Sequence, residues 1–359
     1  KAYGITGVFC HRKQSLRYSR HFFIFQPYIN ISDFGIYGGI VMDRVRWMTG
    51  CDAPEALQYT GRNVYVGVLD SGIALHPDLK GRIAAFEDFT SDRRQRAQSV
   101  CYDDNGHGTH VCGCLAGSGR ASKGRFRGIA PECLLICGKV LDKKGGGSLK
   151  NLVRGLEWML EMKKKLPLRI INISIEMESE ENLNKDELAL LRKYFEQLWM
   201  QNTTIIAAAG NKGPNPMTLS PLGECGSCIC VGCHDGGFVG AGGRTCSEYS
   251  GRGPGKRENV VSANPLKKPD LVAPGTDIIS CNYRFNAKPY IAKSGTSMSA
   301  PIVSGACALC LQKYPRLTNH ELRRVLLSST KDMGEKWSVQ GAGMIRIDRM
   351  LTQKIVMVR

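Results

Sequence analysis

Short apolar runs rich in β-branched residues recur along the chain, separated by polar and glycine-rich segments. They span Val64–Leu69, Leu134–Val140, Ile170–Ile175, Thr204–Ala209 and Cys228–Val231. Continuous runs of this length predict buried β-strands. The stretches between them predict helices, for example over residues 149–164. Strands that alternate with helices predict an α/β fold, with a mostly parallel central sheet covered by helices on both faces.

Two polar side chains stand where these elements begin or end. Asp70 directly follows the first strand, in Val68-Leu69-Asp70-Ser71-Gly72. Ligands of open α/β sheets bind at the carboxyl ends of strands, although Asp-Ser-Gly is also ordinary turn chemistry. His107 lies between two glycines at the start of a small-residue helix, where it is either a catalytic or a packed histidine. His110 falls inside that helix and is predicted to be packed.

A serine opens another apolar helix. Ser297 precedes a run of small residues that contains Pro301, which is tolerable near a helix start. A helix start supplies free N–H groups and a favourable dipole for a developing oxyanion, although serine is also a common helix cap. Serine is a weak nucleophile that needs an adjacent base, a role suited to histidine, and a buried carboxylate orients that base. The three residues together indicate nucleophilic catalysis.

The three segments resemble the subtilisin family of serine proteases. The resemblance extends from about Met48 to Asp348 and includes the segments 207–211 and 268–275. The order Asp, His, Ser along the chain is the order known for subtilisin. The resemblance implies a three-layer subtilisin-like fold and an endopeptidase that forms an acyl-enzyme on Ser297. It also implies that His107 acts as general base and then acid, that Asp70 orients His107, and that Asn211 donates to the oxyanion.

The resemblance also places substrate-binding residues. Gly145 and Gly146 belong to the segment whose main chain pairs with extended substrate, or else to a flexible loop before a helix. Ser174 and Ile175 match the strand beside the first specificity pocket. Glu176 stands where the family usually has glycine. Its carboxylate either favours basic substrate side chains by charge complementarity or points to solvent.

Metal binding receives limited support from the sequence. The loop of residues 117–125, where many family members bind calcium, is basic and holds no Asp, Glu or Asn. Since calcium prefers carboxylates among six to eight oxygen ligands, we expect no site there, although structural calcium elsewhere stays compatible. We expect no metal in the active site and no cofactor for the chemistry. Two Cys-x-x-Cys pairs form either a zinc cage or buried thiols: Cys225, Cys228, Cys230 and Cys233.

The composition suits one catalytic domain preceded by an extension. The chain has 359 residues, of which 42% are hydrophobic. We expect an extension over residues 1–47 and the peptidase domain over residues 48–359. The extension carries an apolar stretch, residues 21–25, and is either an inhibitory segment that occupies the cleft or a packing segment.

Charge and cysteine content bear on partners and compartment. The net charge is +17, yet no nucleic-acid module accompanies it, so we expect polypeptide substrates and no specific nucleic acid. No apolar run reaches the length of a membrane span. Fifteen cysteines, an odd number, favour a reducing compartment, the cytoplasm; secretion after signal removal is the alternative.

Two rival functions stay open on sequence grounds. One is a non-catalytic binding module on the same fold, which the intact set of catalytic residues disfavours. The other is a thiol-rich redox or metal protein. The physiological substrate, the pocket preference and the oligomeric state are not readable from the residues.

Overall fold

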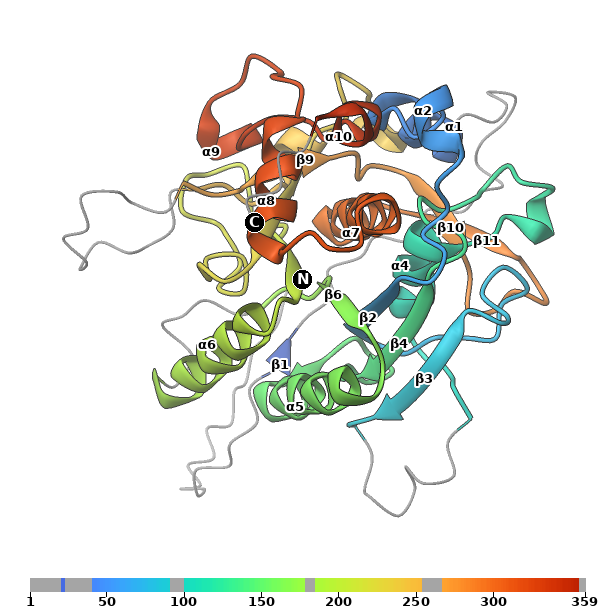
Figure 1. The fold of residues 1–359 in the computed structure, drawn as a ribbon, viewed down its shortest axis with the longest axis vertical. Helices are drawn as coiled ribbons and strands as arrows, with labels where there is room; N and C mark the ends of the chain where they lie inside the picture. The colour runs from blue at the N-terminus through green and yellow to red at the C-terminus, as the bar shows by residue number, and fades with distance from the viewer. Residues whose placement is uncertain (1–20, 23–40, 91–99, 178–184, 254–266, 355–359) are drawn as a thin grey trace, which may run out of the picture.

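The computed structural model describes residues 21–22, 41–90, 100–177, 185–253 and 267–354. Its centre is a seven-stranded parallel sheet in the order β3-β4-β2-β6-β7-β8-β9 (Figure 1). The strands are β2 (Tyr65–Asp70), β3 (Ile83–Asp88), β4 (Leu134–Lys139), β6 (Leu168–Ile173), β7 (Thr204–Ala208), β8 (Ile229–Cys233) and β9 (Leu271–Ala273). All five strands predicted from the apolar runs are present, with ends within two residues of the prediction.

Helices cover both faces of this sheet, which confirms the predicted three-layer architecture. On one face lie α4 (His107–Ala116) and α7 (Thr296–Lys313), which also pack against each other. On the other face lie α5 (Leu149–Lys165) and α6 (Lys185–Met200). Successive strand residues point to opposite faces, so Val68 joins the core beneath α7 while Leu69 joins the core beneath α5. A strand buried on both faces needs a continuous apolar run, which is the pattern found in the sequence.

The central helix α7 is buried on all sides. Every residue from Thr296 to Leu311 is buried. A helix that is apolar all round belongs in the middle of a protein core, and the small residues of α7 permit close approach by its neighbours. The first turn of this helix therefore holds Ser297 in a rigid setting.

The remaining elements are peripheral. Two short strands pair antiparallel, β10 (Ile278–Cys281) with β11 (Tyr290–Lys293). The others are β1 (His21–Phe22), α1 (Val41–Thr49), α2 (Pro54–Leu57), β5 (Gly147–Ser148), α8 (Asn319–Ser328), α9 (Trp337–Gln340), α10 (Ile347–Thr352) and the 3₁₀ turns η2 (Arg120–Ser122), η4 (Ala241–Gly243) and η5 (Cys246–Glu248). Within the described ranges, none of the helices has both the length and the apolar character that crossing a membrane requires.

Candidate active site

Asp70 and His107 are joined at the carboxyl edge of the sheet. Asp70 is the last residue of β2, and its Oδ1 accepts a hydrogen bond from His107 Nδ1 at 2.7 Å. Both side chains are buried, with 1% and 0% exposed. The other ring nitrogen, His107 Nε2, has no partner among the described residues. The imidazole is therefore oriented through one nitrogen and leaves the other for a proton transfer.

Glycines bring His107 this close to β2. Gly106 precedes α4 with φ 95°, and a Cβ there would lie 2.3 Å from the Tyr283 ring. A Cβ on Gly108 would lie 2.2 Å from the carbonyl oxygen of Gly72. Both glycines have a packing role, because they let the first turn of α4 approach the segment after Asp70.

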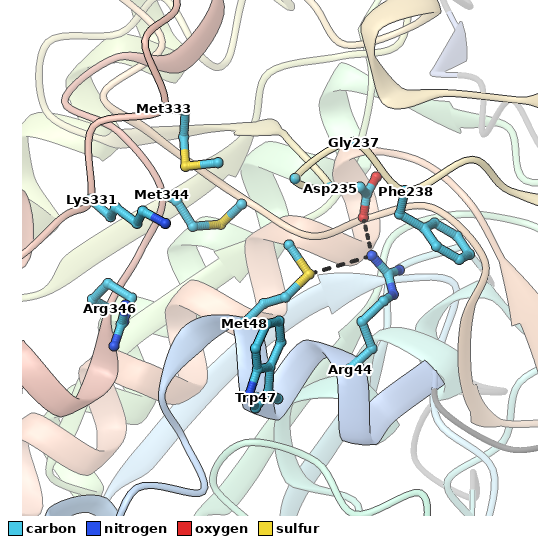
Figure 2. A pocket seen from close by; sticks show the side chains of 11 residues that line it. Arg44, Trp47, Met48, Asp235, Gly237, Phe238, Lys331, Met333, Met344 and Arg346 are labelled. Atoms are coloured by element: carbon cyan, nitrogen blue, oxygen red, sulfur yellow. Dashed lines mark hydrogen bonds and ion pairs between the residues drawn. The ribbon is translucent and has the colours of Figure 1, made fainter.

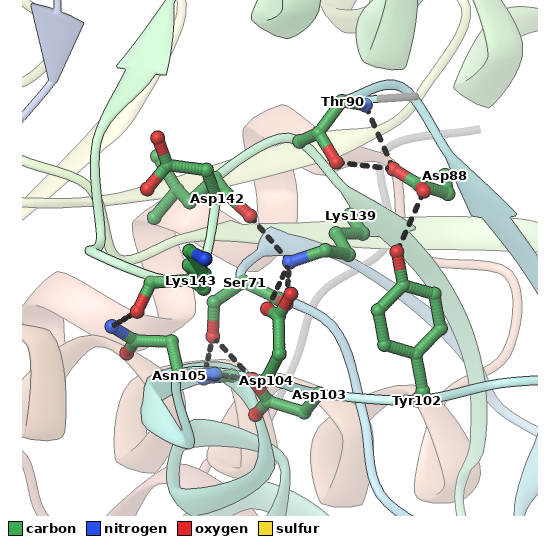
Figure 3. A network of polar contacts seen from close by, with 12 residues as sticks. Ser71, Asp88, Thr90, Tyr102, Asp103, Asp104, Asn105, Lys139, Asp142 and Lys143 are labelled. Carbon is green, nitrogen blue, oxygen red and sulfur yellow. Dashed lines mark hydrogen bonds and ion pairs between the residues drawn. The ribbon is translucent and has the colours of Figure 1, made fainter. Parts of the chain in front are cut away.

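A buried polar network, which the sequence analysis missed, holds the start of α4 (Figure 3). Asp103 accepts hydrogen bonds from the main-chain amides of Asn105, Gly106 and Thr109 and from the hydroxyl of Ser71. Burial raises the pKa of Asp103, but the bonds from Thr109 and the neighbouring amides outweigh it, so the pKa is lowered overall. The acidic run just before His107 was the available signal, since Asp and Asn are favoured before helix starts.

Lys139 anchors the same network from β4. It pairs in register with Asp70, and its Nζ donates to the carbonyl oxygens of Ser71 and Leu141 at 2.8 and 2.7 Å. It also forms an ion pair with Asp104 at 2.7 Å. A lysine at the end of an otherwise apolar strand was the sign of such a role in the sequence.

Ser297 is tied to the end of the neighbouring strand. Its Oγ donates to the carbonyl oxygen of Ser174 at 3.0 Å, and Ser174 Oγ donates to the carbonyl oxygen of Ser297 at 3.0 Å. Pro301 lies inside α7 and has no N–H to bond that carbonyl four residues earlier, so the hydroxyl of Ser174 takes its place. Leu69 pairs with Ile173, so Ser174 lies beside Asp70 at the same edge. Within the described residues, no hydrogen bond joins Ser297 to His107.

Asn211 follows β7 and faces the first turn of α7. Its Oδ1 accepts from the main-chain amide of Thr296 at 2.9 Å. This bond directs Nδ2 away from Thr296, and Nδ2 donates to Glu176 Oε2 at 3.4 Å. The structure thus brings together Ser174, Glu176, Asn211 and Ser297.

Glu176 is buried beside Asn211 with 9% of its surface exposed. The alternative in which it points to solvent is wrong, because the backbone after β6 turns its side chain toward Gly210 and Asn211. Its Oε1 lies 3.4 Å from where a Cβ of Gly210 would be. Burial raises the pKa of Glu176, while Asn211 and the charge of Lys212 act in the opposite direction.

The other predicted substrate residues differ in which of their atoms a ligand could reach. Ile175 packs in the core beneath α5, so only its main chain is available to a ligand. Gly145 and Gly146 sit in a closed turn, in which Asp142 Oδ1 accepts from Gly146 N at 3.1 Å. The next residues form β5, which pairs antiparallel with β1, His21 opposite Ser148. The pairing involves Gly147 and Ser148 only, so the role of Gly145 and Gly146 in substrate binding stays a prediction.

Comparison with known proteins identifies the family. A family model described as the subtilase family matches residues 61–344. The serine protease AprX of Bacillus subtilis (strain 168) is 35% identical over 80% of this chain and 66% of its own length. Subtilisin DY of Bacillus licheniformis is 30% identical over 83% of this chain and 94% of its own length. The chain belongs to the subtilase family, the subtilisin-like serine proteases. A cold-adapted subtilisin-like serine proteinase shares the fold, with a TM-score of 0.61 and 23% identity over 80% of this chain and 90% of that one.

In the loop of residues 117–125, where we expect no calcium site, the carboxylates that calcium prefers are missing. Residues 117–125 contribute no carboxylate, and main-chain bonds close the loop, with Gly124 N donating to Gly119 O at 2.8 Å. The nearby Asp78 carboxylate accepts from Ala121 N at 2.8 Å and from the Tyr290 hydroxyl at 2.7 Å. His76 uses both ring nitrogens, toward Pro289 O and Asp78 N. These oxygens and nitrogens are satisfied by the protein itself.

The four cysteines of the proposed zinc cage are not gathered. Cys228 Sγ donates to the carbonyl oxygens of Leu222 and Cys225, while Cys230 packs against Ala209 and Leu219. Among the described residues, the groupings with metal-ligand spacing are His76 with Asp78 and Cys281, and Cys233 with Asp235 and Cys246. In the second, Asp235 already accepts from the amides of Gly275 and Thr276. The arrangement contradicts a four-cysteine zinc site.

A pocket of about 590 Å³ lies between α1, the loop after β8 and the segment 331–346 (Figure 2). Arg44 crosses it, bonds Asp235 at 3.1 Å and Thr276 O at 2.9 Å, and stacks on Phe238. Arg346 pairs with Asp348. Arg44 thus ties α1 to the loop after β8 and to Thr276, and α1 (Val41–Thr49) spans the expected boundary at residue 47.

Proposed function

We propose that this chain is an endopeptidase in which Ser297 attacks the scissile carbonyl. His107 Nε2 takes the hydroxyl proton as the Oγ–carbon bond forms, and then gives it to the leaving amine. Asp70 holds the Nδ1–H and stabilises the imidazolium. Water then attacks the ester carbonyl with His107 again as base, which releases the acid and restores the Ser297 hydroxyl.

The observation that carries this proposal is the buried Asp70–His107 bond with Nε2 left without a partner among the described residues. A buried imidazole nitrogen without a partner has an energetic cost that a structural histidine would avoid. Ser297 now donates to Ser174, but rotation about its side-chain bond turns the hydroxyl away from that carbonyl. Catalytic hydrogen bonds are often absent or long before substrate binds.

Asn211 supports the oxyanion in this proposal. Its Oδ1 accepts from the amide of Thr296, which leaves Nδ2 as the donor, and in the proposal Nδ2 acts together with the main-chain N–H of Ser297. Removal of one such donor costs about 100- to 1,000-fold in kcat, a magnitude established on subtilisin itself. We expect Asn211→Ala to lose activity to this extent while it keeps its fold.

Extended substrate would pair with the main chain of Gly145 and Gly146 on one side and of Ser174 and Ile175 on the other. The pairing of β1 with β5 supports this, because it shows that the adjoining residues accept an antiparallel strand. It also supports an inhibitory role for the extension of residues 1–47, since β1 lies next to the substrate segment. The peptidase domain would then be residues 48–359.

The rest of the proposal concerns partners and location. No cofactor enters the chemistry above, and the substrates are polypeptides rather than nucleic acids. The fourteen cysteines within the described ranges form no disulfide, which supports a reducing compartment such as the cytoplasm.

The test is labelling by a serine-directed fluorophosphonate probe, with Ser297→Ala and His107→Ala as comparisons. We expect labelling of the intact chain that disappears in both variants. An unlabelled chain, also unlabelled after deletion of residues 1–40, would support the binding-module alternative. That deletion leaves α1 in place, so the fold keeps its Arg44 and Arg46 contacts.

A further inference from the structure

The buried carboxylate of Glu176 forms no salt bridge within 4 Å with a described residue, although the charge of Lys212 acts on it from further away. Its hydrogen bonds come from two neutral groups of Asn211, the main-chain amide and the side-chain Nδ2, and the bond from Nδ2 is long at 3.4 Å. The other well-buried acids have stronger partners. Asp70 has His107 at 2.7 Å, and Asp270 has Lys268 at 2.6 Å. A buried carboxylate without a cation is costly, and such groups are normally paired.

The position of this carboxylate points to the substrate residue that it would meet. In the proposed mechanism, Asn211 Nδ2 binds the oxygen of the scissile carbonyl. The side chain of the residue that carries this carbonyl branches from the adjacent carbon. A group within one hydrogen bond of Asn211 Nδ2 therefore lies next to that side chain. Gly210 has no side chain, and a Cβ there would lie 3.2–3.4 Å from Ser220 N, Ser220 Cβ and Glu176 Oε1, so the glycine lets these groups pack closely.

We propose that Glu176 makes the enzyme prefer substrates with Lys or Arg on the acyl side of the scissile bond. The proposal rests on the proposed function, because it takes Asn211 as the oxyanion donor. A cationic side chain would supply the charge-assisted hydrogen bonds that the carboxylate lacks. It would also draw the carboxylate from Asn211 Nδ2, which frees that donor for the oxyanion. Both effects favour the transition state for basic substrates.

The experiment compares peptides that differ only at this position, with Lys, Arg, norleucine, Leu or Glu. Norleucine keeps the length of lysine without its charge. The enzymes are the intact chain, Glu176→Gln, and Glu161→Gln as a control that removes the same charge from an exposed position on α5. We expect the kcat/KM ratio of Lys to norleucine to be at least about tenfold in the intact chain and in the control. In Glu176→Gln the ratio should fall by at least about tenfold.

An unchanged ratio in Glu176→Gln would overturn the inference. A ratio near one in the intact chain would overturn it too. Fluorophosphonate labelling of all three proteins separates this failure from failure of the proposed function. If Ser297 is labelled and the ratios do not change, only the role of Glu176 is wrong. If neither the intact chain nor the chain without residues 1–40 is labelled, the proposed function itself fails.

Discussion

Replacement of Lys139 by methionine tests whether the buried polar network next to His107 stabilises the folded protein. The substitution keeps the apolar stem and removes the ammonium group. It leaves two buried acceptors, the carbonyl oxygens of Ser71 and Leu141, without this donor. Each orphaned acceptor costs about 1–3 kcal/mol. Asp104 is 40% exposed and can be solvated by water, so the loss of its ion pair with Lys139 contributes little. We expect the free energy of unfolding to fall by about 2–6 kcal/mol.

The measurement is equilibrium unfolding in guanidinium chloride. It is made in a Ser297→Ala background, so that self-digestion does not interfere. Lys143→Met is the matched control, because Lys143 is exposed on the adjacent turn and its ammonium group bonds to no other described residue. Surface substitutions of this kind usually change stability by less than about 0.5 kcal/mol. A change in Lys139→Met as small as in the control would refute the reasoning.

The same variant tests how stability and catalysis are connected. Ser71 follows Asp70, and its hydroxyl links Asp103 to the amide of Gly108, next to His107. Loss of the Lys139 bond to Ser71 should therefore loosen the His107 position. A misplacement of about 1 Å can reduce a rate by about 100-fold, so we expect kcat to fall by about 10- to 100-fold. The KM for peptides should change less, since Lys139 lies beneath the substrate region.

Three further predictions follow from separate features. Burial raises the pKa of Glu176 above its unfolded value, so ionisation favours the unfolded chain. Below about pH 4.5, the wild-type protein should be as stable as Glu176→Gln. As the pH rises through the folded pKa, the wild-type protein should become less stable than the variant, which urea unfolding at a series of pH values would measure. Deletion of residues 1–24 removes β1 and should raise initial hydrolysis rates several-fold, while equal rates would exclude an inhibitory pairing. Finally, burial raises thiol pKa values, to about 11 for Cys51 and about 12 for Cys114, so a thiol reagent should modify few of the 15 cysteines before unfolding and all of them after.

Each of the features tested above has a different role. Lys139 and Asp103 belong to the hydrogen-bond network that holds His107. Glu176 is proposed to select the substrate side chain, and β1 is proposed to limit substrate access to the active site. The three measurements are stability, substrate selectivity and initial hydrolysis rate. A variant that changed all of them together would show that these regions are coupled through α4 and α7, which pack against each other.

Much of the fold was determined by local sequence patterns. Strands buried on both faces need unbroken apolar runs, so β2, β4, β6, β7 and β8 were visible in the residues alone. The Asp, His and Ser segments were also readable, because each joins a reactive side chain to an element end with small neighbours. Glycines at positions 106 and 108 were visible as well, although their packing against Tyr283 and Gly72 was not.

Other features depended on which distant residues meet, and no local pattern encodes that. Whether Glu176 faces solvent or Asn211 was decided by the packing of the segment after β6 against the segment after β7. The carbonyl of Ser297 freed by Pro301 finds its donor in Ser174, 123 positions away in sequence. Cys-x-x-Cys spacing allowed a zinc cage, but the strand β8 sends its thiols to different surroundings. Spacing restricts which side chains can share a face, whereas burial and hydrogen-bond partners come from long-range packing, which only the tertiary structure supplies.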